Sequence, residues 1–356
     1  MVQLINPSFI YTHIFYTVQR YFYLIVLRLV CSRCGEEVET DDETVRFCNK
    51  CGTLLNRVFT GTNRQKSTSK KRIFDYDVEL ATEIGKVLHE QFSTKTGYFE
   101  GHVMPEYIMP DIEPGSREMA LYYTYVLAVD YQTDAHRLWR RSRTQYDAHP
   151  EMFEPEVILD TPDDQLRAFV QSIGARFPKN GAKAWKTISR ILIDKYDGDP
   201  RNLTRNPITT KELERRLDQF PYIRGKKIGA LFQRVMGDLG LLQISDLDKV
   251  DVAVDLQVSR FTFYTGVLKP IGNVSGSVQQ PPIRPAIEGV WRQAANNIGI
   301  APWKLDEPIW VIASNQCTGM ICGPCPVRGL CERNFHIEVQ GNQVICRKSG
   351  KGFLTS

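Results

Sequence analysis

The sequence has no apolar segment long enough to cross a membrane. The apolar stretch near its start is interrupted by Arg20 and Arg28, whereas a spanning helix needs about 20 predominantly apolar residues. No small-residue cleavage site precedes the first cysteines, so nothing indicates a secretory signal. We therefore expect no membrane partner. Residues 1–30 stay unassigned, with three interpretations: a misassigned start just before Cys31, a short amphipathic helix, or a weak membrane contact.

The composition also lacks a large excess of either charge. There are 45 lysines and arginines against 41 aspartates and glutamates, which gives a net charge of +4. This weak positive charge permits a nucleic-acid partner but requires that any binding patch be local. Hydrophobic residues make up 42% and charged residues 24%, which excludes a disordered or fibrous class. The 356 residues are enough for two or three domains.

Cysteine is present in an organised pattern. Eight of the nine cysteines form two sets of four, one near each end of the chain, and only Cys346 is left over. Four thiols with CxxC pairs, in a chain without a secretory signal, favour metal binding over disulfides. The two sets are Cys31, Cys34, Cys48 and Cys51, and Cys317, Cys322, Cys325 and Cys331.

The first set consists of two CxxC pairs separated by thirteen residues. This spacing predicts a structural Zn²⁺ site in a small β zinc ribbon over residues 31–56. Residues 57–73 are polar and basic and predict a linker. Its basic residues would either lie along phosphates or belong to a solvated tether.

Residues 74–340 predict a mainly α domain, followed by a C-terminal tail over 341–356. Apolar side chains recur at helical spacing in several segments, for example at Leu166 and Val170. The segment from Met119 to Val129 is apolar on every side and predicts a buried central helix. Between Phe74 and Pro308 we find no alternating strand pattern and no internal repeat, which favours a compact helical body.

The segment from Leu217 to Gly240 predicts two helices joined by a tight turn that contains Pro221 and Gly225. The sequence VDVAVDLQV follows, and then the second set of cysteines, over 317–331. In this order the chain resembles the helix-hairpin-helix DNA glycosylases of the endonuclease III superfamily, over roughly residues 115–331. The resemblance implies the fold of that family, with two helical subdomains and a cysteine loop.

The resemblance also implies a catalytic pair. In bifunctional members of the family, the nucleophile is a lysine two residues after a hairpin glycine, and counting from Gly225 places Lys227 there. A register shift of one residue would select Lys226 instead. The positive end of the helix dipole should disfavour the ammonium form of an amine at this place. Asp255 matches the essential aspartate, which would stabilise the developing sugar cation and accept a proton; a helix-capping aspartate is the alternative.

The hairpin turn would bind the DNA backbone. Exposed N–H groups at a helix start can hold a phosphate; Gly225 would allow a close approach, and Arg224 and Lys226 would add positive charge. Two positions depart from the family pattern: Ile223 stands where another glycine is usual, and Gln257 where many relatives carry histidine. A plain helical hairpin with a basic turn is the alternative interpretation.

The segment before Thr133 occupies the place of a family loop that fills the gap left by a flipped base. The register makes Tyr131 the wedge, followed by Gln132, since an aromatic ring can stack in such a gap. A core tyrosine is the alternative for Tyr131. Asp130 is a candidate residue of the base pocket.

The second set of cysteines has gaps of four, two and five residues. It resembles the family loop that holds a [4Fe–4S] cluster, although the usual first gap is six; Zn²⁺ is the alternative. The cluster would fix a loop whose basic residue, Arg328, reaches the DNA backbone.

The predicted function is base-excision repair of double-stranded DNA by a monomeric glycosylase, with lyase activity at the abasic site. Two alternatives stay open. One is a monofunctional glycosylase in which Asp255 activates water, and the other is a non-catalytic DNA-binding repair protein with the same fold. The expected location is the cytoplasm, with the nucleoid, or the nucleus of a eukaryote.

Overall fold

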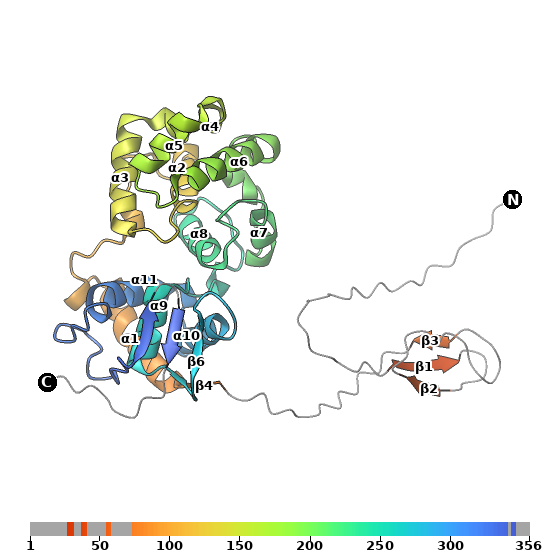
Figure 1. The fold of residues 1–356 in the computed structure, drawn as a ribbon, viewed down its shortest axis with the longest axis vertical. Coiled ribbons are helices and arrows are strands. Elements are labelled where there is room, and N and C mark those ends of the chain that lie inside the picture. The colour runs from red at the N-terminus through yellow and green to blue at the C-terminus, as the bar shows by residue number, and fades with distance from the viewer. Residues whose placement is uncertain (1–26, 32–36, 41–54, 58–72, 341–342, 347–356) are drawn as a thin grey trace. The chain divides into compact units, whose positions relative to one another are not determined.

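The computed structural model describes residues 27–31, 37–40, 55–57, 73–340 and 343–346. The chain divides into two compact units, residues 1–70 and 71–356. In the first unit, the strands β1 (Leu27–Cys31), β2 (Glu37–Thr40) and β3 (Leu55–Arg57) form an antiparallel sheet with β1 in the middle (Figure 1). Leu29 of β1 pairs with Val38 of β2 and with Arg57 of β3.

This sheet occupies the region of the predicted zinc ribbon. Strand β1 begins at Leu27, before the predicted boundary at Cys31, and Cys31 is its last residue. Three of the four predicted zinc ligands, Cys34, Cys48 and Cys51, lie outside the described residues, as do residues 1–26 and 58–72.

The second unit is mainly helical with small sheets, and it contains two hydrophobic cores. We call the part built on the core between Met119 and Leu242 the central lobe. The terminal lobe is built on core residues from 74–104 and 252–344, so both ends of the unit contribute to it. Figure 1 shows the central lobe in yellow and green above the terminal lobe, which is orange, cyan and blue.

The central lobe comprises the helices of the middle of the chain. Every residue from Met119 to Leu127 is buried, which confirms the predicted central helix. Glycine and aspartate in the left-handed conformation end two of the predicted helices, at Gly174 and Asp197. The helices are α2 (Arg117–Leu127), α3 (Ala135–Ala148), α4 (Pro155–Asp160), α5 (Asp163–Ser172), α6 (Pro178–Tyr196), α7 (Thr210–Leu217) and α8 (Lys226–Asp238), with the 3₁₀ turns η3 (Pro150–Phe153), η4 (Pro200–Thr204) and η5 (Leu247–Lys249).

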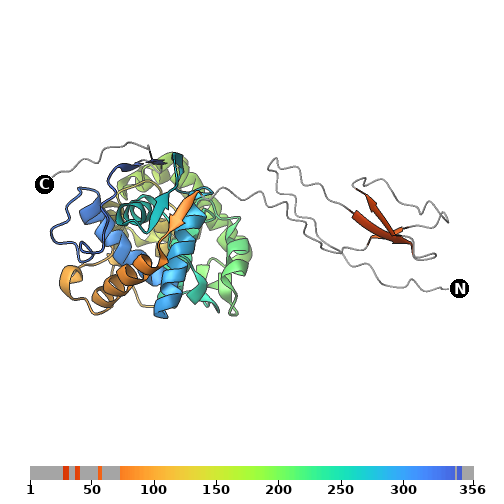
Figure 2. The ribbon, with the colours of Figure 1, turned by 90° about the horizontal axis from the view of Figure 1, so that it is seen from below.

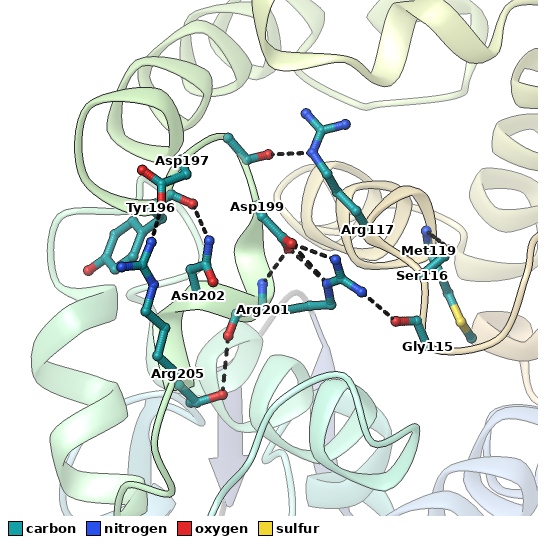
Figure 3. A network of polar contacts seen from close by, with 12 residues as sticks. Gly115, Ser116, Arg117, Met119, Tyr196, Asp197, Asp199, Arg201, Asn202 and Arg205 are labelled. Atoms are coloured by element: carbon teal, nitrogen blue, oxygen red, sulfur yellow. Dashed lines mark hydrogen bonds and ion pairs between the residues drawn. The ribbon is translucent and has the colours of Figure 1, made fainter.

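A polar network fastens the start of α2 to the turn after α6 (Figure 3). The guanidinium of Arg201 donates to the Asp199 carboxylate at 2.9 Å and to the Gly115 carbonyl at 2.8 Å. Arg117 Nε donates to the Gly198 carbonyl at 3.1 Å. These bonds satisfy the carbonyls of Gly115, before α2, and Gly198, after α6, so the network links these two elements within the central lobe.

In the terminal lobe, α1 lies beside α10 (Figure 2), and Trp291 of α10 is fully buried. The helices are α1 (Val78–Ser93), α9 (Leu256–Thr265), α10 (Ile283–Ile298) and α11 (Asp306–Ile312), with the 3₁₀ turns η1 (Gly97–Phe99), η2 (Pro105–Tyr107) and η6 (Pro302–Leu305) and the π-helical turn η7 (Ala313–Cys317). The strands are β4 (Phe74–Tyr76), β5 (Leu268–Pro270), β6 (Val274–Ser277), β7 (Ile337–Gln340) and β8 (Gln343–Cys346).

These strands correct two predictions. We predicted no strands between Phe74 and Pro308, but β4 pairs with β5, and β6 pairs with β8. Such short strands show little alternation, and their partners lie far away in the sequence, so the pattern conceals them. We also assigned 341–356 to a tail, whereas β8 lies between β6 and β7 and belongs to the lobe.

None of the described helices is both long enough and apolar enough to span a membrane.

Candidate active site

The predicted hairpin is formed by α7, α8 and the turn between them. Gly225 is the N-cap of α8, and a Cβ atom added there would lie 3.1 Å from the Tyr222 carbonyl oxygen. Gly229 donates the first helical hydrogen bond, to the Gly225 carbonyl, so the N–H groups before it have no intrahelical acceptor. The sequence comparison placed Ile223 where the family usually has a second glycine, but the side chain of Ile223 is buried. The residue with a left-handed backbone is its neighbour Tyr222, with φ of 64°. The conformation that favours glycine therefore occurs at position 222 and not at 223.

The two adjacent lysines at the start of α8 point to different partners. Lys227 Nζ lies 3.9 Å from Asp255 Oδ2. Lys226 Nζ instead lies 3.3 Å from the Glu214 carboxylate on α7, and both of these side chains are exposed. Of the two candidate nucleophiles, only Lys227 is therefore paired with the candidate acid.

Asp255 serves two purposes with its two oxygens. As the N-cap of α9, its Oδ1 accepts hydrogen bonds from Gln257 N at 2.7 Å and Val258 N at 2.9 Å. Its Oδ2 is the atom that faces Lys227. The helix-capping interpretation and the catalytic interpretation are thus compatible, because the cap fixes the carboxylate that meets the lysine.

Lys227 and Asp255 line a cavity of about 1110 Å³ between the two lobes. Residues far apart in the sequence converge on it, from the end of α2, the hairpin turn and the start of α9. Eight of its lining residues are candidate site residues predicted from the sequence: Asp130, Tyr131, Gln132, Arg224, Gly225, Lys226, Lys227 and Asp255. Gln257, which the sequence singled out as a departure from the family pattern, also lines the cavity. Arg328 is not among the lining residues; it belongs to the cysteine loop, where it donates to the Gly323 carbonyl at 3.2 Å.

The charge state of Lys227 differs from the prediction. Burial lowers the pKa of this lysine, but nearby carboxylates outweigh burial and raise the pKa above its ordinary value. The resting side chain is therefore an ammonium ion, and the helix dipole that we invoked does not free the amine. The carboxylates, in order of decreasing effect, are Asp255, Asp130, Asp306 and Glu106.

A buried ionic cluster beneath the cavity was missed by the sequence analysis. The side chain of Arg234 on α8 is 3% exposed and forms ion pairs with Glu106, Glu307 and, at 3.6 Å, Asp306. Burial raises the pKa of Asp306 to about 7, although Arg234 opposes the shift. Asp306 and Glu307 lie in the first turn of a helix, where acidic residues are common, so their positions in the sequence do not indicate a buried cluster. The one available signal was the seven-residue spacing from Lys227 to Arg234, which places both side chains on the same face of a helix.

Asp130 and Tyr131 have contrasting surroundings. Asp130 is buried, and burial raises the pKa of its carboxyl group, which Lys227 opposes. Tyr131 is 39% exposed, so it is not a core tyrosine, and its ring lies 6.1 Å from the ring of Tyr222 and 6.2 Å from that of Phe177. Gln132 is exposed beside it, with φ of 53°. An exposed aromatic group therefore stands at the cavity mouth next to the hairpin turn.

Gln257, where a histidine is usual, connects the cavity to the cysteine loop. Its Oε1 accepts hydrogen bonds from Arg260 at 2.5 Å and from Thr318 at 3.2 Å. Arg260 also donates to Thr318 at 2.8 Å. The amide is thus engaged in fixing α9 against the residue that follows Cys317.

The cysteines of the loop at 317–331 are free thiols of intermediate burial. Burial and, to a smaller extent, the charges of the three other cysteines raise the pKa of Cys317 to about 12, so the four share one neighbourhood. In the described part of the chain, no three His, Cys, Asp or Glu side chains are gathered closely enough to hold one metal ion. Soft thiols in one neighbourhood have the chemistry that an iron–sulfur cluster requires, with each thiol on its own iron.

Comparisons with known proteins find only distant similarity. No protein-family model matches the chain, and no curated protein matches it. Among solved structures, a thermostable thymine-DNA glycosylase is 15% identical with a TM-score of 0.46, and an endonuclease III trapped on DNA is 17% identical with a TM-score of 0.45; both alignments cover 72% of this chain and 97% of the other. The 8-oxoguanine DNA glycosylase of Methanocaldococcus jannaschii is 15% identical with a TM-score of 0.39, over 65% of this chain and 93% of the other. Likeness at this level establishes no shared activity.

Proposed function

We propose that the chain is a DNA glycosylase that removes a damaged or mismatched base from double-stranded DNA and then cleaves the strand at the abasic site. The observation that carries this proposal is the 3.9 Å approach of Lys227 Nζ to Asp255 Oδ2, in a cavity between two lobes. An amine beside a carboxylate in such a cavity is suited to covalent attack on a sugar carbon.

The proposed reaction begins with proton transfer, because Lys227 is an ammonium ion at rest. Asp255 accepts the proton, and the free amine forms a bond to C1′ while the glycosidic bond breaks and the base departs with the bonding electrons. Opening of the sugar gives a protonated Schiff base. Asp255, after giving its proton to the departed base, then accepts a C2′ proton, and the electrons of that C–H bond expel the 3′ phosphate and cleave the strand.

The surroundings of the pair suit an extruded nucleoside. Arg224 and Lys226 lie at the hairpin turn, where the open N–H groups of α8 would hold a phosphate. Tyr131 would stack in the gap left in the duplex, with Gln132 beside it. Asp130, buried where it lines the cavity, can accept hydrogen bonds from the edge of the base.

A monofunctional glycosylase is the second candidate, and the raised pKa of Lys227 favours it. In that case Lys227 stays an ammonium ion that stabilises the departing base, and Asp255 activates a water molecule.

Excision assays on duplexes that each carry one lesion, with sodium borohydride present, separate these functions. Base release with a covalent adduct is the expected result. Base release without an adduct would favour the monofunctional enzyme. If no duplex of the panel loses a base although one is bound tightly, the chain is a non-catalytic DNA-binding protein.

We further propose a [4Fe–4S] cluster on Cys317, Cys322, Cys325 and Cys331, and a Zn²⁺ ion on Cys31, Cys34, Cys48 and Cys51. The cluster would hold its loop, including Arg328, in place for the DNA backbone. Protein purified without oxygen should contain about four iron atoms and about one zinc atom per chain. A colourless protein with about two zinc atoms would contradict the cluster.

A further inference from the structure

The ionic cluster around Arg234 links the elements that carry the two reacting groups. Arg234 lies seven residues after Lys227 on α8, and residues two turns apart share a helix face. Its guanidinium Nε lies 3.6 Å from Asp306 Oδ2. The other oxygen of that carboxylate, Asp306 Oδ1, accepts a hydrogen bond from Ala253 N at 3.1 Å. One buried carboxylate therefore joins α8 to the backbone two residues before Asp255.

The same short segment has other polar ties. Before Ala253, Arg292 donates two hydrogen bonds to the Asp251 carboxylate, and Trp303 N donates to the Val250 carbonyl at 3.1 Å. Closer to Asp255, Gln279 Nε2 donates to the Val254 carbonyl at 2.5 Å. The bonds at Ala253 and Val254 involve main-chain atoms next to Asp255, so they fix where this carboxylate emerges from the segment.

We propose that Asp306 is a positioning residue: by forming an ion pair with Arg234 through one oxygen and accepting a hydrogen bond from the Ala253 backbone with the other, it holds Asp255 of the terminal lobe against Lys227 of the central lobe. This inference rests on the proposed function, since it concerns the same pair.

The charge of Asp306 gives the role a pH signature. Burial raises the pKa of Asp306, Arg234 opposes this shift and the neighbouring acids add to it, and the resulting pKa of about 7 means that the group changes charge near neutral pH. Above this pH the carboxylate is ionised and is attracted to Arg234; below it, the link weakens. Ionised Asp306 also raises the pKa of Lys227. The charged groups that act on Asp306 and Lys227 are Glu106, Asp130, Arg234, Asp255 and Glu307.

The test compares Asp306→Asn with Glu307→Gln in the full, metal-loaded chain. Each removes one negative charge beside Arg234, but Glu307 makes no bond to Ala253 and does not line the cavity. The measurement is the rate of borohydride trapping on a duplex with one abasic site, as a function of pH, with the duplex Kd measured separately.

For Asp306→Asn we expect trapping to slow by about 10- to 100-fold with Kd unchanged, as misplacement of a reacting group predicts. The basic limb of its pH profile should move to lower pH, because one carboxylate that raises the Lys227 pKa is gone. Glu307→Gln should keep the wild-type midpoint of the basic limb, because the carboxylates that raise the Lys227 pKa are Asp255, Asp130, Asp306 and Glu106. Asp306→Glu keeps the negative charge but moves it by one methylene group. Its trapping rate should also be low, while the midpoint of the basic limb should stay closer to that of the wild type. This variant replaces Asp306→Asn if the asparagine variant does not fold.

Wild-type rate and profile in Asp306→Asn would overturn the inference, and so would equal shifts in Asp306→Asn and Glu307→Gln, which would indicate general destabilisation. Failure of the proposed function looks different, because the wild-type protein itself would then form no adduct on the abasic duplex.

Discussion

The rim and the floor of the cavity are built on opposite principles. At the rim, Lys226 is 56% exposed and pairs with an exposed glutamate. On the floor, Arg234 is 3% exposed and is surrounded by buried acids. An exposed ion pair contributes little to stability and is easily replaced, whereas a buried charge is costly unless it is fully paired. The rim is thus suited to hold a polyanion loosely, and the floor to place a few groups accurately.

Lys226 and Lys227 bring this contrast to adjacent residues. Both have the same side chain at the start of one helix, but only Lys227 turns inward to meet Asp255. The residue type alone therefore does not distinguish the two lysines. The direction of each side chain and the residue it pairs with determine which one can act as the nucleophile. Substitutions of residues inside the cavity and at its rim should therefore have different effects on chemistry and on DNA binding.

The largest effect should come from Lys227→Gln, which removes the proposed nucleophile. We expect loss of the borohydride adduct, because Lys227 is the amine that pairs with Asp255 among the described residues lining the cavity. Lys226→Gln is the matched control, since it removes the neighbouring amine and its exposed pair with Glu214. Adduct formation that survives in Lys227→Gln and disappears in Lys226→Gln would reverse the assignment. Denaturing gel electrophoresis of the trapped duplex measures both.

Asp255→Asn should slow base release by about 10²–10⁴-fold, which is typical for loss of a general base. The asparagine Oδ1 can still accept the bonds from Gln257 N and Val258 N, so the melting temperature should change little. Asp251→Asn, in the same segment, removes an acid whose partner is Arg292 and that does not line the cavity. A similar loss of activity in both variants would show that the segment matters only for stability.

Much of this arrangement follows from local sequence patterns. The buried helix α2 (Arg117–Leu127), the hairpin and the cap at Asp255 are set by apolar spacing and by residues near each other in the chain, so they could be predicted. The charge of Lys227 could not, because it depends on four carboxylates that come from distant elements. Arg234 was missed for the same reason, since its partners Glu106 and Glu307 lie far from it in the sequence. The pairing of strands β4 and β5 could not be predicted for the same reason, since the two strands lie far apart in the sequence.

Tyr131→Ala should weaken binding to lesion duplex by about 1–3 kcal/mol, the usual range for loss of one stacked ring. Tyr131→Phe keeps the ring and should bind as the wild type does, because the hydroxyl only accepts a bond from the neighbouring Gln132 at 3.2 Å. Fluorescence anisotropy with abasic and undamaged duplexes gives the difference. Equal weakening on both duplexes would argue against a wedge, since only the flipped state leaves a gap to fill.

The smallest effect should come from Arg224→Gln at the rim. One lost phosphate contact should reduce the slope of log K against log salt by about 1, with the same effect on lesion and undamaged duplex. Lys249→Gln is the control, because this lysine is 71% exposed, pairs with Asp246 and does not line the cavity. Binding measured over a salt series distinguishes the two. If Arg224→Gln changed base release without changing the salt slope, the rim would take part in the chemistry, and the separation between a loose outer surface and an accurate floor would fail.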